Sequence, residues 1–244
     1  MRSQRPVFRA IAMAVIGLSL AVPSGLLQAQ EVDPNAVADA AMPAPMKVTR
    51  EAVAFAQAAV TKYVTDVITA ENAARFGFKS FADAQKATVG TPYVVALIRM
   101  DKLKAYRQAT DVKGLWTMPK KLWFPVTVQG QTRTKVEILL RKDKFIAGEF
   151  GGIRSVQEVA RATRELPRLI EAREIEKVKQ VALIKVPPLN ATFLFVETDD
   201  QQFLVPALTM PQRYKLKRDT MYPAHEVLMA LQPFAEKVEG RKLQ

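Results

Sequence analysis

The stretch LWFPVTVQGQTRTKVEILL, residues 122–140, decides the predicted fold because it has the pattern of a β-hairpin. Two runs rich in β-branched and aromatic residues flank Gln129-Gly130-Gln131, and glycine in such a short connection is typical of a hairpin turn. The second run alternates apolar and charged residues, whose side chains point to opposite faces of a strand. The apolar face holds Val136, Ile138 and Leu140, and the outward face holds Arg133, Lys135 and Glu137. The stretch therefore predicts antiparallel strands with one apolar face.

Segments on both sides of the hairpin extend this sheet. Residues 93–100 (YVVALIRM) form a β-rich run bounded by turn residues, which favours a buried strand. Residues 145–150 (FIAGEF) predict a third strand, which Gly151 and Gly152 end. We read GEFGG as a tight strand-to-helix turn, because it lacks the spacing of a phosphate-binding glycine loop.

A helix is expected directly after these glycines. Ser155 and Glu158 have the spacing of a capping box, which predicts that the helix begins near Ser155. Pro167 should end or kink it, because proline removes a helical hydrogen bond. The residues expected to point inward are Val156, Val159, Ala160 and Leu166.

The second half of the chain repeats this order of elements. VALIRMDKLKA (residues 95–105) returns as VALIKVPPLNA (residues 181–191), each within a predicted strand. A second hairpin follows around residues 199–201 (DDQ), and a helix is expected with Pro223 at or near its first turn. Two explanations stay open: an internal duplication, or two strands that share a composition common among buried strands.

The predicted class is α+β, with one or two mainly antiparallel sheets and packed helices after an N-terminal helical segment. We divide the chain into a signal peptide (1–30), an Ala/Pro-rich linker (31–48), a helical segment (49–88) and two strand–hairpin–helix units (89–170 and 171–244). We expect the two units to form one compact domain.

The N-terminus has the three-part pattern of a secretory signal peptide. Arg2, Arg5 and Arg9 precede a short uncharged apolar run, residues 10–22, and small residues follow before Ala29. The alternative, a membrane anchor, requires a longer apolar run. Thr49 and Ser80 are the expected N-caps of two helices in the segment that follows the linker. The sequence thus predicts an exported chain, periplasmic or secreted, with no transmembrane segment in the mature part.

Composition limits the chemistry and the partners of this chain. Of 36 basic residues, three lie in residues 1–30, so 33 remain against 24 acidic residues, and the mature charge is +9. We expect an anionic envelope component or an acidic protein as partner, and no nucleic acid, because the chain is exported. Beyond residue 30 there are two serines, one histidine (His225) and no cysteine, which excludes cysteine catalysis and Cys/His zinc sites. We expect no cofactor, no metal and no catalytic residue, and we read Asp199–Asp200 as a turn.

Two basic clusters are the candidate partner-binding residues. The first lies around the hairpin and the second in RYKLKR, residues 213–218, and Trp116, Trp123 and Tyr214 lie near them in sequence. Such a mixture suits an anionic partner or a membrane interface. Solvated charges without a partner are the alternative. The residues predicted to bind are Lys120, Lys121, Arg133, Lys135, Arg213, Lys215 and Lys217.

One resemblance supports the fold class. Residues 87–95 (ATVGTPYVV), 122–131 (LWFPVTVQGQ) and 145–152 (FIAGEFGG) resemble poorly characterised exported bacterial proteins, in which a GxP strand precedes an FPV hairpin. The likeness covers about the middle third of the chain. It implies an exported α+β module and brings no activity or functional residues.

The preferred hypothesis is an exported, non-enzymatic binding or envelope-associated module with a basic surface. One alternative is a hydrolase that uses a carboxylate pair on envelope glycans. Another is a periplasmic chaperone or assembly factor with an exposed apolar groove.

Overall fold

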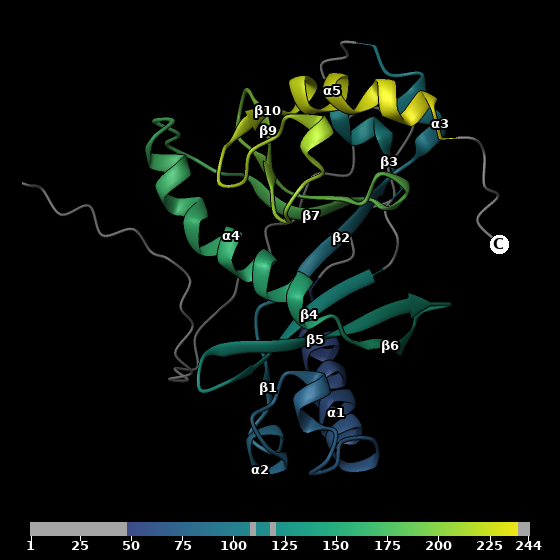
Figure 1. Cartoon of the computed structure of the whole chain (residues 1–244), viewed down its shortest axis with the longest axis vertical. Coiled ribbons are helices and arrows are strands. Elements are labelled where there is room, and N and C mark those ends of the chain that lie inside the picture. The colour runs from purple at the N-terminus through teal and green to yellow at the C-terminus, as the bar shows by residue number, and fades with distance from the viewer. Residues whose placement is uncertain (1–47, 108–110, 118–120, 239–244) are drawn as a thin grey trace, which may run out of the picture. The chain divides into compact units, whose positions relative to one another are not determined.

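Two antiparallel sets of strands meet at one parallel pair in this protein (Figure 1). The computed structural model describes residues 48–107, 111–117 and 121–238. In that part of the chain the strands form a ten-stranded sheet in the order β10-β9-β8-β7-β2-β4-β5-β6, with β1 beside β4 and β3 beside β2. The mainly antiparallel sheet with packed helices confirms the predicted α+β class.

The strands are β1 (Thr88–Val89), β2 (Tyr93–Ile98), β3 (Trp116–Thr117), β4 (Lys121–Val128), β5 (Gln131–Arg141), β6 (Lys144–Gly151), β7 (Gln180–Val186), β8 (Ala191–Glu197), β9 (Gln202–Pro206) and β10 (Tyr222–Pro223). The α-helices are α1 (Arg50–Asp66), α2 (Phe81–Ala84), α3 (Met100–Lys104), α4 (Ile153–Glu171) and α5 (Ala224–Glu236). Short 3-10 helices are η1 (Ala73–Phe76), η2 (Val112–Leu115), η3 (Pro187–Leu189) and η4 (Gln212–Tyr214).

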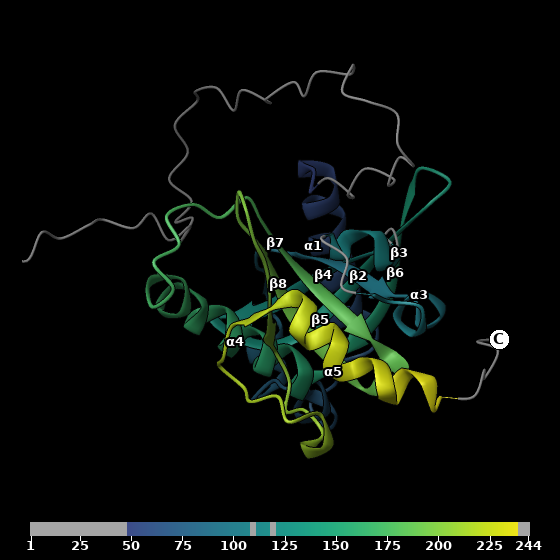
Figure 2. The same cartoon turned by 90° about the horizontal axis from the view of Figure 1, so that it is seen from above.

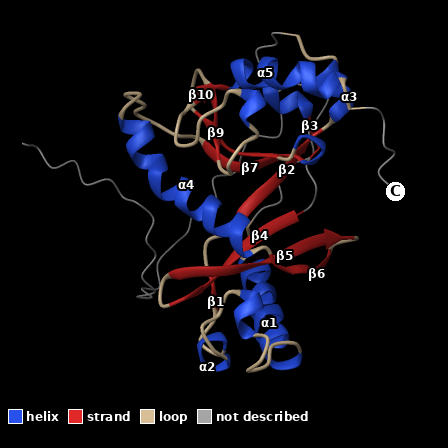
Figure 3. Ribbon diagram, viewed as in Figure 1, coloured by secondary structure: helices blue, strands red, loops and turns tan. Residues whose placement is uncertain are grey.

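The helices cover both faces of the sheet (Figure 3). Helix α4 packs on one face, against Val95, Leu183 and Leu194. Helices α3 and α5 pack on the opposite face of the β7–β8–β9 half, where Ile184 and Phe193 lie (Figure 2). Helix α1 covers that same face of the β4–β5 half. The central strands are apolar along their length, and successive side chains point to opposite faces of the sheet. Both faces therefore present apolar side chains that the helices can bury.

Both predicted hairpins are confirmed. Strands β4 and β5 pair antiparallel from Lys121↔Leu139 to Val128↔Gln131, and Gln129 and Gly130 have positive φ angles of 52° and 74° at the turn. Positive φ at both central residues belongs to the turn whose twist matches that of paired strands. Strands β8 and β9 form the second hairpin.

The helix caps were predicted with mixed success. Thr49 and Ser80 cap α1 and α2, since their hydroxyl oxygens accept hydrogen bonds from Ala52 N and Asp83 N. The capping box at Ser155 was wrong. Helix α4 begins at Ile153 after Gly152, which has φ +74°, and the Ser155 hydroxyl donates to the Gly152 carbonyl from inside the first turn. A left-handed glycine thus starts the helix two residues earlier than the side-chain pattern indicated.

Two prolines lie within helices. Pro167 does not end α4, which continues to Glu171, so that part of the prediction was wrong. Pro223 is the N-cap of α5, in agreement with its predicted position, while Pro233 lies inside the helix. Helix α5 turns Val227, Leu228 and Leu231 toward the core, where they are fully buried.

The twin VALI strands lie side by side as the parallel pair β2–β7, with Val95 opposite Leu183 and Leu97 opposite Lys185. Ala96 and Ala182, equivalent in the repeat, face the same side of the sheet. The next strand of each unit, however, lies on opposite flanks, since β4 follows β2 and β8 follows β7. The two units therefore run in the same direction and turn equivalent side chains to the same face of the sheet, but each adds its next strand on the opposite side. Two such arrangements are related as mirror images. No rotation superposes them in this register, which favours shared strand composition over duplication.

The predicted signal peptide, residues 1–30, and all of the predicted linker, residues 31–48, except Val48 lie outside the described residues. In the described ranges, none of the helices has the length and apolar character needed to cross a membrane.

Candidate functional site

The face of the sheet under α4 holds a polar network centred on Trp123 and Glu137. These residues are direct partners on β4 and β5, and the indole Nε1 of Trp123 donates a 2.7 Å hydrogen bond to Oε1 of Glu137. Both residues are buried, with 2% and 7% of their surface exposed. A buried carboxylate requires partners of opposite charge, because burial disfavours its ionised form.

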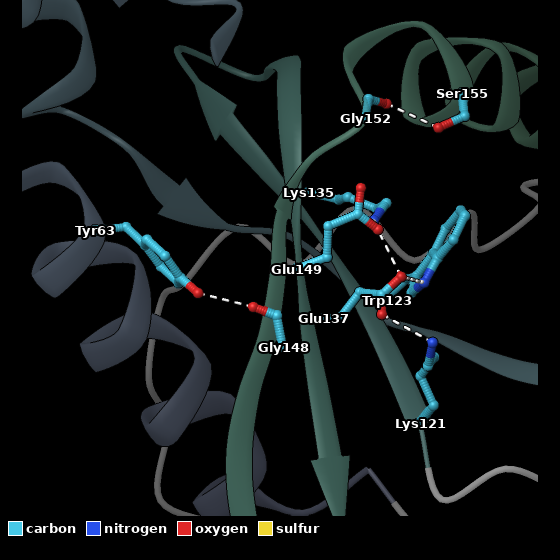
Figure 4. A network of polar contacts seen from close by, with 9 residues as sticks. All are labelled: Tyr63, Lys121, Trp123, Lys135, Glu137, Gly148, Glu149, Gly152 and Ser155. Carbon is cyan, nitrogen blue, oxygen red and sulfur yellow. Dashed lines mark hydrogen bonds and ion pairs between the residues drawn. The ribbon is translucent and has the colours of Figure 1, made fainter. Parts of the chain in front are cut away.

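Two lysines supply that charge. Lys121 Nζ lies 2.8 Å from Oε2 of Glu137, and Lys135 Nζ lies 3.1 Å from Oε1. Lys135 Nζ also lies 2.8 Å from Oε2 of Glu149, whose side chain is exposed (Figure 4). Burial alone would raise the pKa of Glu137, but the hydrogen bonds and charges of Lys121 and Lys135 outweigh it and hold that pKa below its ordinary value. We call these five residues, Lys121, Trp123, Lys135, Glu137 and Glu149, the lysine network.

Glycines of the GEFGG segment make room for the network. Strand β6 has an irregular register opposite Glu137, between the pairs Val136↔Phe150 and Ile138↔Ala147. A Cβ atom at Gly148 would lie 3.3 Å from Cβ of Glu137, and one at Gly152 would lie 2.9 Å from Cε of Lys135. The segment is therefore more than a strand-to-helix turn, because its glycines allow the two charged side chains to pack beside the backbone.

Lys185 on β7 joins the network from the other half of the sheet. Its Nζ lies 4.3 Å from the ring centroid of Trp123, while Lys135 Nζ lies 4.5 Å from the same centroid. Burial lowers the pKa of Lys185; the positive charges of Lys135 and Lys121 act in the same direction, and Glu137 and Glu149 oppose them. Nothing in the local sequence of Lys185 indicated that it would contact Trp123, 62 positions earlier.

The expectation that Lys135 lies on an outward surface was wrong. Lys135 is 2% exposed, because α4 packs over the face to which it points. The aromatic residues predicted to share that surface are also buried: Trp116 packs edge-on against Phe195, and Tyr214 donates a 2.7 Å hydrogen bond to the Leu189 carbonyl. Alternation along a strand identifies a face but not what covers it.

The other predicted binding residues lie apart from the network. Lys120 lies outside the described residues. Arg213 lies against the rings of Tyr214 and Phe234, at 5.0 and 5.8 Å from their centroids. Lys215 and Lys217 are exposed on the loop before β10. Arg133 is half-buried and belongs to a second site.

That second site is a pocket of about 650 Å³ between α4 and the β4–β5 turn. Its charged lining contains a single glutamate, Glu158, beside five arginines: Arg133, Arg154, Arg161, Arg164 and Arg218. We call it the arginine pocket. Arginine presents a planar array of donors suited to phosphate and carboxylate groups.

Neighbouring acids compensate part of this charge. Arg161 Nη1 donates to both carboxylate oxygens of Asp219, at 2.8 and 2.6 Å, and Arg154 Nε lies 3.2 Å from Glu158. Arg133 Nε lies 3.7 Å from Asp83. Three acids thus face five arginines, which leaves two positive charges uncompensated.

Arg161 also has unused donors. Its Nε and Nη2 atoms are buried and have no hydrogen-bond partner within the described part of the chain. Arg164 is exposed and makes no ion pair there. Buried donors without a partner are uncommon in proteins, and where they line a pocket they are open to an acceptor that enters it.

The sequence contained part of this signal. Arg161 and Arg164 are three residues apart on the predicted helix, which places them on one face, and Arg154 directly precedes that helix. The arrival of Arg218 from a loop 54 positions beyond Arg164 was not readable from spacing.

The lysine network also bears on the hydrolase hypothesis. Glu137 and Glu149 share Lys135 as partner. Lys121 and Lys135 hold the pKa of Glu137 below its ordinary value, so Glu137 is stabilised in its ionised form. A glycosidase requires one protonated acid. The Asp199–Asp200 turn is occupied by local contacts, because Asp199 pairs with Lys179 and Asp200 accepts from Thr198. No group of acids and histidine suited to a metal ion occurs in the described ranges.

Comparisons of the chain with protein-family models, with curated proteins and with solved structures find no match.

Proposed function

We propose that this chain is an exported, non-enzymatic binding protein whose arginine pocket holds a phosphate-bearing component of the cell envelope. The observation that carries the proposal is the pair of buried, unpartnered donors on Arg161 in a pocket lined by five arginines. A phosphate group carries between one and two negative charges at neutral pH, which suits the two uncompensated positive charges. The pocket volume lies within the range of small-molecule sites.

The exposed lysines of the preceding loop belong to the same proposal. Lys215 and Lys217 lie on the segment that supplies Arg218 to the pocket. They would attract the anion from solution through their positive charge. They would contribute little to its final contacts, because salt screens the interactions of exposed charges.

The proposed location rests on residues 1–30. If the chain is exported, protein recovered from the periplasm or medium lacks these residues, as N-terminal sequencing would show. A full-length chain retained in the cytoplasm would contradict this part of the proposal.

Binding to the pocket is tested by calorimetry with pyrophosphate and by co-sedimentation with phosphatidylglycerol vesicles. We expect the double variant Arg164→Gln/Arg218→Gln to weaken binding about tenfold or more, since one lost charged contact corresponds to about 1.4 kcal/mol. Binding to vesicles but not to pyrophosphate would identify the lipid headgroup as the ligand.

Arg168→Gln is the matched control. Arg168 is exposed on the same helix, pairs with Glu165 and does not line the pocket. The double variant Arg168→Gln/Arg173→Gln removes the same number of charges as the pocket variant. If it weakened binding as much as Arg164→Gln/Arg218→Gln does, the attraction would be non-specific. Absence of binding at low salt by the wild-type chain would refute the proposal.

A further inference from the structure

The uncompensated charge of the arginine pocket belongs to two of its residues. Three of the five lining arginines have an acid beside them. Arg164 and Arg218 are exposed and make no ion pair within the described part of the chain. Arg218 Nη1 lies 3.3 Å from the hydroxyl of Thr209, which is a neutral group. One cation without an acidic partner therefore lies on α4, and the other lies on the loop before β10.

Arg161 adds a pair of donors that point in the same direction. Its Nη1 atom is occupied by Asp219. The two buried donors without a partner, Nε and Nη2, lie along one edge of the guanidinium plane. Such an edge binds two oxygens of one anion through two parallel hydrogen bonds. The pocket thus combines one edge that takes two oxygens with two further cations.

The two classes of phosphate ester use these groups to different extents. A phosphodiester has two free oxygens and one negative charge, so the Arg161 edge alone satisfies it. A phosphomonoester has three free oxygens and, above its second pKa of about 6, two negative charges. Its third oxygen and second charge require a further cation, which Arg164 and Arg218 supply.

We propose that the arginine pocket selects ligands that end in a phosphomonoester over phosphodiesters. This inference rests on the proposed function, since it requires that the pocket binds phosphate, and it adds the class of ester. The same terminal group occurs on soluble glycerol phosphates and on the headgroup of phosphatidic acid, so the experiments must separate these two sources.

The acids that face the pocket arginines are Asp83, Glu158 and Asp219. Burial alone would raise the pKa of Glu158, but the hydrogen bonds from the Thr209 amide and Arg154 outweigh it and hold that pKa below its ordinary value. The residues that line the pocket include no histidine. Carboxyl groups ordinarily titrate near pH 4 and a phosphomonoester near pH 6, so a gain of affinity through about pH 6 would originate in the ligand.

Calorimetry with glycerol 3-phosphate and with its diester, glycerophosphoglycerol, tests the preference. At about pH 7.5 we expect the monoester to bind about tenfold more tightly, because it makes one more charged contact. The ratio of the two affinities should fall toward one at about pH 5, where the monoester carries a single charge. A ratio near one at both pH values would overturn the preference and leave the phosphate site intact. Absence of binding by both esters, by pyrophosphate and by vesicles at low salt would refute the proposed function itself.

Vesicles identify the source of the phosphate. Phosphatidic acid and phosphatidylglycerol carry the same two headgroup chemistries, and a higher fraction of phosphatidylglycerol matches the surface charge of the two preparations. Stronger co-sedimentation with phosphatidic acid, without binding of the soluble esters, would support the preference and assign it to a membrane headgroup. Equal co-sedimentation with both, again without binding of the soluble esters, would overturn the preference.

The double variant Arg164→Gln/Arg218→Gln removes both cations that lack an acidic partner. We expect it to lower the affinity for the monoester to that for the diester, so the ratio at about pH 7.5 becomes close to one. Arg168→Gln/Arg173→Gln removes the same number of charges outside the pocket and should retain the ratio. An equal loss of affinity for both esters in the pocket variant, with the ratio unchanged, would contradict the role assigned to Arg164 and Arg218.

Discussion

Trp123 and Glu137 lie directly opposite each other on neighbouring strands and are joined by a 2.7 Å hydrogen bond from the indole to the carboxylate. Through this bond and two lysines, a buried acid is stabilised at the centre of the sheet.

Glu137→Gln should lower the free energy of unfolding by about 3 kcal/mol at neutral pH, because it leaves Lys135 buried with one partner fewer. The pKa of Glu137 is depressed in the folded chain. The stabilisation is therefore complete above about pH 4.3, the ordinary glutamate value, and is lost as the pH falls through the folded-state pKa. Urea unfolding at several pH values measures the difference between the two chains. A difference that does not shrink in acid would contradict this account. Glu165→Gln, at an exposed pair, serves as control.

Trp123→Phe should cost about 2 kcal/mol more than Trp116→Phe. Both tryptophans are buried, but the Trp116 indole nitrogen has no hydrogen-bond partner in the described residues, so phenylalanine there removes no bond. At position 123 the change removes a bond to a charged acceptor, while a ring remains for the two lysines. Thermal unfolding of both variants tests this, and equal destabilisation would show that the bond contributes nothing.

Gly152→Ala should be more destabilising than Gly130→Ala, although both glycines have φ +74°. The left-handed backbone costs each alanine about 1 kcal/mol. At position 152 the new Cβ also lies 2.9 Å from Cε of Lys135, whereas position 130 is open. Denaturant titration should give about 2 kcal/mol in addition for Gly152→Ala. Equal effects would mean that Lys135 moves aside without cost.

Gln232→Met should lower stability by about 2 kcal/mol and loosen the end of α3. Gln232 Nε2 donates to the carbonyls of Lys104 and Tyr106 at 2.9 and 3.0 Å, which connects α5 to that end. Hydrogen exchange of residues 100–107 should accelerate. The exposed change Gln212→Met should leave exchange unchanged, and a similar effect of both variants would rule out the connection.

The hairpins and most helix starts were predictable because they depend on neighbours in sequence. Gly130 fits a left-handed turn, and Thr49 and Ser80 bind amides three residues away. The order of the strands was not predictable in this way, since the β2–β7 pair joins residues separated by 88 positions. The start of α4 at Ile153 was not predicted either, because the residue before it is Gly152 with a left-handed backbone and not a residue with a capping side chain.

The same distinction, between features set by sequence neighbours and features set by distant residues, applies to the candidate sites. Arg133 and Lys135 were found from their alternation on one strand, yet their surroundings differ because α4 covers Lys135 and Arg133 reaches the arginine pocket. Arg218 and Lys185 were missed since each meets its neighbours only in the folded chain. Residue type therefore predicted basic chemistry, while burial and pairing determined which bases have free donors.

The parallel β2–β7 pair has a consequence for the kinetics of folding. Each antiparallel set can form from segments close in sequence, but the central pair must close a loop of more than 80 residues before any of its hydrogen bonds form. Loop closure of that length opposes folding entropically, and non-local pairing of this kind slows it. We expect the two halves to collapse separately and to join last, so the contact between Lys185 on one half and Trp123 of the lysine network on the other would form in the final step.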